Sequence, residues 1–74
     1  MSNDKSIREM LRRSPFKPFE VIMSSGEFHL IKHPENVILG PSRLVAYDLD
    51  LDQVAILDLE HVTELRITTP QQSS

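Results

Sequence analysis

The chain has 74 residues, a formal net charge of -3 and 39% hydrophobic residues, which fits one small domain. It contains no cysteine, and this excludes disulfides, thiolate catalysis, cysteine-ligated zinc and iron–sulfur clusters. A chain this short buries only about 60% of the surface that its unfolded form exposes, so we expect oligomerisation to add stability.

No segment has the length of a membrane helix. The longest apolar runs, 44–47 and 54–57, have four residues each, against about 18 for a bilayer span. Charges interrupt residues 1–13, so this segment does not have the apolar region of a secretory signal. We therefore expect a cytoplasmic protein without membrane contact.

Charge is divided unevenly along the chain. Residues 1–18 hold five Lys or Arg against two Asp or Glu, a local balance of +3, whereas residues 19–74 hold three against nine, a balance of -6. A polyanion would therefore have to bind the N-terminal segment rather than the body of the domain.

The first element is a short helix. Ser6, followed by Glu9, has the spacing of a capping box, and apolar residues then recur at helical spacing, which predicts a helix over residues 6–13. Residues 1–5 are expected to be flexible, and Pro15 is expected to end the helix. The apolar stripe of this helix is Ile7, Met10 and Leu11.

Strands are predicted from residue 19 onward, because the apolar period changes from 3.6 to 2. Phe19, Val21 and Met23 alternate with polar neighbours, and Ser25-Gly26 then supplies a turn into a second strand over residues 28–33. This segment therefore predicts a hairpin.

The second half of the chain predicts three more strands. Pro34 interrupts the chain before a short extended piece at 37–39, and the full strands are expected over 43–48, 53–58 and 62–68. Residues 59–61 form a tight corner before the last strand, in which Thr63, Leu65 and Ile67 are expected to face inward. The tail, residues 69–74, has the composition of a frayed terminus.

The strand at 53–58 is apolar on both faces. Val54 and Ile56 occupy one face, and Ala55 and Leu57 occupy the other. Such a strand is either central in a closed structure or covered by another subunit. For so small a chain, cover by another subunit is the favoured alternative. We predict that Ile56→Asp destabilises the domain by burying a charge, whereas Asp50→Ala is nearly neutral.

One helix and five short strands with brief connections predict a mainly β domain over residues 6–68. The favoured architecture is a strongly bent, five-stranded antiparallel barrel with the helix across one end, because closure removes most exposed strand edges.

This order of elements resembles the Sm-like fold, in which a short helix precedes a five-stranded barrel and a one-turn corner separates strands four and five. The sequence is also similar to a group of short uncharacterised bacterial proteins with no known activity. The matching segments are Ile7-Arg8-Glu9-Met10-Leu11, Pro15 to Phe19, Ser25-Gly26, His33-Pro34-Glu35 and residues 55–65.

The Sm-like resemblance implies a homo-oligomeric ring of about five to eight subunits, made by pairing the fourth strand of one copy with the fifth of the next. It also implies RNA binding at a corner that lines the central pore. Here that corner contains Asp58, Glu60 and His61, and its two carboxylates would repel phosphates.

Two clusters have the residue types of metal ligands. His29 and His33 are four residues apart in a strand, about 13 Å, which is too far to share one ion. Asp48, Asp50 and Asp52 match the first half of a calcium loop, but the glycine and glutamate of its second half are missing, so a solvated hairpin loop is the preferred interpretation.

Two glycines cannot form a glycine-rich phosphate loop, and no serine has the context of a nucleophile elbow. We therefore expect no enzyme activity and no cofactor, and a self-assembling scaffold or adaptor that acts through protein contacts. The alternative is an Sm-like RNA-binding ring that uses the basic helix face of Lys5, Arg8 and Arg12. A third hypothesis is a ring that binds a metal or small molecule at His61.

Overall fold

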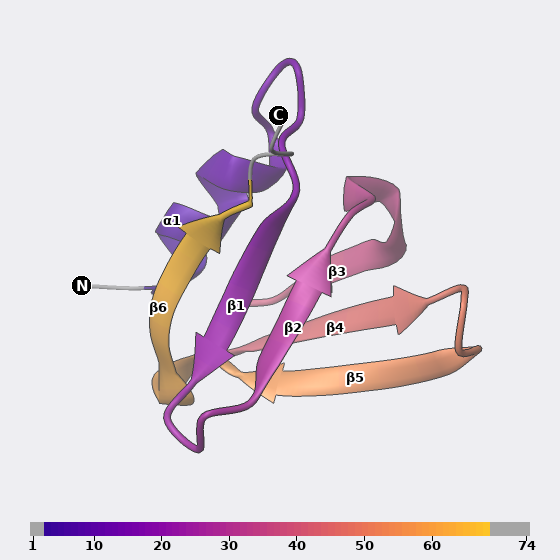
Figure 1. The fold of residues 1–74 in the computed structure, drawn as a ribbon. Helices are drawn as coiled ribbons and strands as arrows, with labels where there is room; N and C mark the ends of the chain where they lie inside the picture. The colour runs from indigo at the N-terminus through magenta and orange to yellow at the C-terminus, as the bar shows by residue number, and fades with distance from the viewer. Residues whose placement is uncertain (1–2, 69–74) are drawn as a thin grey trace.

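The computed structural model of the chain describes residues 3–68. One helix precedes six strands, with two single 3-10 turns between them (Figure 1). The elements are α1 (Asn3–Leu11), β1 (Phe19–Met23), β2 (Phe28–Ile31), η1 (Pro34–Asn36), β3 (Val37–Leu39), β4 (Arg43–Asp48), β5 (Gln53–Asp58), η2 (Leu59–His61) and β6 (Val62–Ile67).

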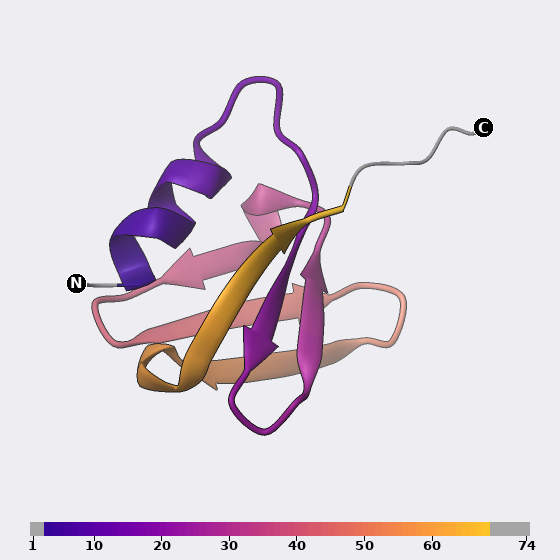
Figure 2. The same ribbon diagram turned by 60° about the vertical axis from the view of Figure 1, so that its left-hand side comes forward.

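The strands form two antiparallel three-stranded sheets that cross each other (Figures 1 and 2). The first sheet has the order β2-β1-β6, and the second has the order β3-β4-β5. No ladder joins the two sheets within residues 3–68, so this part of the chain forms no closed barrel. The mainly β domain with an N-terminal helix is confirmed, but six strands in two sheets replace the predicted five.

Pro34 separates β2 from β3. It begins η1, in which the backbone N–H of Asn36 donates to the carbonyl of His33 at 3.1 Å. Proline has no N–H to donate to a ladder, so the chain leaves the first sheet after Ile31 and enters the second sheet at β3.

The helix begins at Asn3, so the predicted start at Ser6 is wrong. Asp4 lies in the first turn, where a carboxylate favours the positive end of the helix dipole, and it accepts a hydrogen bond from Arg8 at 3.4 Å. This places Ser6 inside the helix rather than at its cap. The helix ends before Pro15, as predicted.

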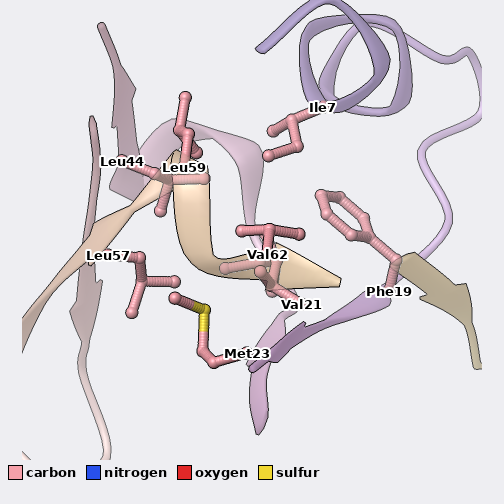
Figure 3. Close-up of a cluster of buried hydrophobic side chains, with 9 residues drawn as sticks. Ile7, Phe19, Val21, Met23, Leu44, Leu57, Leu59 and Val62 are labelled. Carbon is pink, nitrogen blue, oxygen red and sulfur yellow. The ribbon is translucent and has the colours of Figure 1, made fainter. Parts of the chain in front are cut away.

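The core lies between the two sheets and beneath α1. Figure 3 shows side chains from both sheets pointing toward one another, with Ile7 of α1 pointing toward them from the helix. Ile7 has no exposed surface, so the short helix is held by packing onto the sheets. The buried hydrophobic residues are Ile7, Phe19, Val21, Met23, Ile31, Leu44, Leu57, Leu59 and Val62.

The β1–β2 hairpin turns at Ser25-Gly26, as predicted. The N–H of Gly26 donates to the carbonyl of Met23 at 2.9 Å, and Gly26 has a φ of +96°. This backbone conformation favours glycine because a side chain would be strained there. In β1, the predicted alternation is confirmed, since Phe19, Val21 and Met23 are the buried positions.

The strand limits 43–48 and 53–58 and the corner 59–61 are confirmed, whereas the inward face of β6 is only partly as predicted. Leu65 lies opposite buried Val21 and is half-buried, but Thr63 and Ile67 are exposed. The register between β1 and β6 shifts at Ile22 and Met23, so Val62, which lies opposite Met23, takes the buried position in place of Thr63. The predicted tail at 69–74 lies outside the described residues.

Candidate protein interface

Apolar side chains cover the outer face of the second sheet. Ile38, Val45 and Ile56 lie opposite one another on β3, β4 and β5 and form a row across the whole sheet. Ile38 is 71% exposed and Ile56 is 66% exposed. We call this surface the apolar outer face; its residues are Ile38, Val45, Tyr47, Val54 and Ile56.

The two-sided apolar pattern of β5 explains this surface. Leu57 faces the core and is 4% exposed, so its neighbour Ile56 points to the opposite side of the sheet. The single chain therefore leaves Ile56 exposed, and the alternative in which closure of the structure itself buries this face is wrong. Cover by another subunit stays a prediction.

The apolar outer face ends at β5, which is an edge strand of its sheet. Within residues 3–68, β5 pairs only with β4, and β6 pairs only with β1. A strand edge presents a row of backbone N–H and carbonyl groups that can pair with another strand. The apolar outer face therefore borders an edge that is able to accept a strand of a second molecule.

The corner at η2 brings together the three predicted pore-lining residues. Ligand atoms of Asp58, Glu60 and His61 lie within 4.8 Å of one another. Asp58 precedes the turn and accepts a hydrogen bond from the backbone N–H of Glu60 at 3.4 Å. Carboxylate oxygens and imidazole nitrogens are ligands that divalent transition metals bind. The two carboxylates also make the corner negatively charged.

The predicted basic helix face is at the surface. Lys5 and Arg12 are exposed, and Arg8 forms an ion pair with Asp4 on the preceding turn of the helix. Asp4 therefore partly neutralises the charge of Arg8. Lys5 and Arg12 are the other two cations of this face. Arg12 lies just beyond the end of α1.

The aspartates of the β4–β5 loop do not converge on one point. Asp48 accepts hydrogen bonds from the backbone N–H of Asp50 at 3.0 Å and of Leu51 at 3.3 Å, and the Asp50 carboxylate pairs with Lys32 at 3.2 Å. Asp52 adopts a left-handed φ of 54°. Each carboxylate thus has a partner of its own, as expected for a solvated hairpin loop rather than for a calcium loop.

Tyr47 donates a hydrogen bond from its hydroxyl to the Asp52 carboxylate. This bond, followed by desolvation, raises the pKa of Tyr47 above its ordinary value of 10.0. The neutral phenol is the donor, so the hydrogen bond favours the protonated form.

The two histidines of the β2 region have separate neighbours. The Nε2 atom of His29 lies 3.8 Å from Glu27, and Nδ1 of His33 lies 3.8 Å from Glu35. His29 is half-buried, whereas His33 is exposed after the end of β2. The two histidines therefore contact different carboxylates, each two residues away in the sequence.

A cleft that the sequence did not predict lies between β2 and the β4–β5 hairpin. It has a volume of about 510 Å³, and its lining includes Phe28 and Leu30 on one side and Leu49, Leu51 and Val54 on the other. Phe28 is 63% exposed. The sequence signal was Pro34, which stops β2 and leaves the two sheets apart on this side.

A scan of protein-family models, a search of curated proteins and a search of solved structures each find no match to the chain. Among the described residues, no helix has the length and apolar character needed to cross a membrane. The fold therefore defines the chain as a small mainly β domain with an N-terminal helix and two antiparallel sheets.

Proposed function

We propose that this domain is a non-enzymatic, self-associating module that acts as a scaffold or adaptor through protein contacts. The observation on which this proposal rests is the apolar outer face, where Ile38 and Ile56 are each more than half exposed and lie in one cross-strand row. Contiguous exposed apolar surface on a small domain is typical of an interaction site. Association would cover this face and would add buried area that a chain of this size needs.

The proposed mode is a ring of the Sm-like type. The strands β2 and β3 follow each other in the chain and are separated only by η1, so they can be regarded as two halves of one bent strand. Counted in this way, the two sheets give the order β6-β1-β2/β3-β4-β5, which is that of a bent five-stranded barrel. The two ends of this order are β6 and β5, whose outer edges have no strand partner within residues 3–68. Pairing β5 of one copy with β6 of the next would satisfy both edges and generate a heterologous, closed assembly.

The charges favour a protein partner over RNA. Asp58 and Glu60 lie together at the corner, and ring symmetry would repeat them around an axis, which repels phosphate. An RNA ligand would instead contact the basic helix face, which consists of Lys5, Arg8 and Arg12. We therefore treat RNA as an outcome of the test rather than as the proposed ligand.

The first experiment is size-exclusion chromatography with light scattering at several concentrations, with the 260/280 nm absorbance ratio recorded for each peak. We expect a mass that is a multiple of the 8.5 kDa chain, without nucleic acid. A monomer at every concentration would contradict self-association. An assembled peak that contains RNA would replace the adaptor role by RNA binding.

Two variants identify the surface. Ile56→Asp places a charge on the apolar outer face and is expected to give a monomer that remains folded, since its side chain is exposed in the single chain. Phe28→Asp is the matched control, because Phe28 is about equally exposed but lies in the other sheet. If Ile56→Asp keeps the native mass, the apolar outer face is not the interface.

A further inference from the structure

The outer edge of β2 has backbone groups that are free to pair. The N–H of Met23 donates to the carbonyl of Glu27 at 2.8 Å, and the antiparallel register places Val21 opposite His29. In an antiparallel ladder the backbone groups of successive residues point to opposite sides. His29 and Ile31 therefore bond to β1, while the N–H and carbonyl groups of Phe28 and Leu30 point away from β1. No strand pairs with this edge within residues 3–68.

The cleft of about 510 Å³ runs beside the same edge. Its lining includes backbone or side-chain atoms of Phe28 and Leu30 on β2, and of Leu49 and Leu51 on the β4–β5 loop. Its volume lies within the range of about 300–1,000 Å³ that is typical of ligand sites. If an extended chain pairs with β2, every second side chain of that chain could therefore enter the apolar cleft.

The charges beside the cleft are mostly negative. Asp48 and Asp50 belong to its lining, and Asp52 follows on the same loop. Lys32, the one cation among the residues that line the cleft, is held in the ion pair with Asp50. A ligand with lysine or arginine at its ends would complement this loop.

We propose that the β2 edge and the adjacent cleft bind an extended peptide segment of a partner protein as an additional strand. The segment would have apolar side chains at alternate positions and basic residues at its ends. This inference deepens the proposed adaptor role, and it uses an edge that the proposed β5–β6 contact leaves free. A second copy of this chain fits the site less well, because its own β2 is preceded by the acidic Glu27 and the Lys32 that follows β2 is already paired with Asp50.

The test begins with a random heptapeptide phage library selected against the full chain. The enriched peptide is synthesised with a fluorophore, and its affinity is measured by anisotropy together with amide exchange of the ¹⁵N-labelled protein. We expect a dissociation constant of about 1–100 μM and slower exchange at the amides of Phe28 and Leu30. Absence of any peptide that binds more tightly than about 1 mM, or protection only at other strands, would overturn the proposal.

Backbone pairing is tested separately from side-chain contact. Leu30→Pro removes the outward N–H and is expected to weaken binding about tenfold or more, whereas Leu30→Thr keeps the N–H and is expected to change it less. A peptide methylated on alternate backbone nitrogens gives the same test without altering the protein's fold. If the methylated peptide and Leu30→Pro both bind normally, the peptide is not an added strand.

Light scattering on the same samples separates this inference from the proposed self-association. Leu30→Pro is expected to leave the native mass unchanged, because Leu30 lies outside the apolar outer face. Loss of peptide binding with unchanged mass supports the β2 site. If the chain is a monomer and binds the peptide normally, the β2 site is supported and the assembly is contradicted. If peptide binding is lost only in samples whose native mass has fallen, the site belongs to the subunit interface instead.

Discussion

Ile56 and Leu57 are consecutive residues of β5 that lie on opposite faces of the same sheet, with exposed fractions of 66% and 4%. Leu57 belongs to the core between the sheets, and Ile56 belongs to the apolar outer face. Substitutions at Leu57 should therefore report on folding of the single chain, and substitutions at Ile56 should report on the proposed association.

Replacement of Leu57 by alanine is expected to lower the free energy of unfolding by about 2–4 kcal/mol, because it leaves a cavity in the core. Ile56→Ala is expected to change the stability of the dissociated chain by less than about 1 kcal/mol. Urea unfolding at a concentration where the chain is monomeric measures both. Similar losses for the two variants would show that β5 does not have the observed inward face.

The contact between Ile7 and the core is expected to hold α1 in place. Ile7→Ala should lower the free energy of unfolding by about 2–4 kcal/mol, since the isoleucine side chain is fully buried. A helix of nine residues has little stability of its own, so its amides should exchange faster in the variant than those of β4. Arg12→Ala is the control, because Arg12 is exposed and should leave stability and exchange nearly unchanged.

The ion pair between Lys32 and Asp50 is expected to contribute little stability. The two groups are 3.2 Å apart, but the side chains are 50% and 76% exposed, so solvent screens their attraction. Asp50→Ala should change the free energy of unfolding by less than about 0.5 kcal/mol. Thermal unfolding at low and high salt checks this, and a loss above about 1 kcal/mol would show that the loop is a structural anchor.

Tyr47 is expected to titrate at a pH above 10. The raised pKa comes first from its hydrogen bond to Asp52, and the folded state therefore holds the phenol proton more tightly than the unfolded state does. The resulting stabilisation is fully present below the ordinary pKa of 10.0 and is lost as the pH rises through the higher folded pKa.

Absorbance at 295 nm measures this titration directly, because Tyr47 is the one tyrosine of a chain without tryptophan. Asp52→Asn is expected to lower the midpoint toward the ordinary value. A midpoint that is the same in the native chain and in Asp52→Asn would show that the hydrogen bond does not form in solution.

Local pattern was sufficient to predict most elements. Alternation in Phe19, Val21 and Met23 predicted the buried face of β1, and the limits of β4 and β5 follow from the turns that flank them. The corner at 59–61 was predicted from the local pattern, whereas Asp58, Glu60 and His61 were singled out by the resemblance to the Sm-like fold. The structure shows that the side-chain ligand atoms of these three residues lie close together.

Features that depend on the relation between distant strands could not be predicted in this way. A strand such as β5, with apolar residues on both faces, has the same period whichever face is inward, so Ile56 and Leu57 could not be distinguished. The start of α1 was placed one turn late because Ser6 and Glu9 match a capping box, while Asp4 offers an acidic first turn of its own. The cleft depends on the separation of β2 from the other sheet. Pro34 was the one feature of the local sequence that indicated this separation.

Both passages of the chain from one sheet to the other run through a 3-10 turn of three residues, η1 and η2. Each turn fixes the direction in which the next strand leaves, so an added residue in either one would rotate one sheet against the other and disturb the core. The loops at 24–27 and 49–52 connect strands within a single sheet and can lengthen without this effect. Insertions, epitope tags and fluorescent labels should therefore be tolerated at these two hairpin tips and rejected at the two crossings.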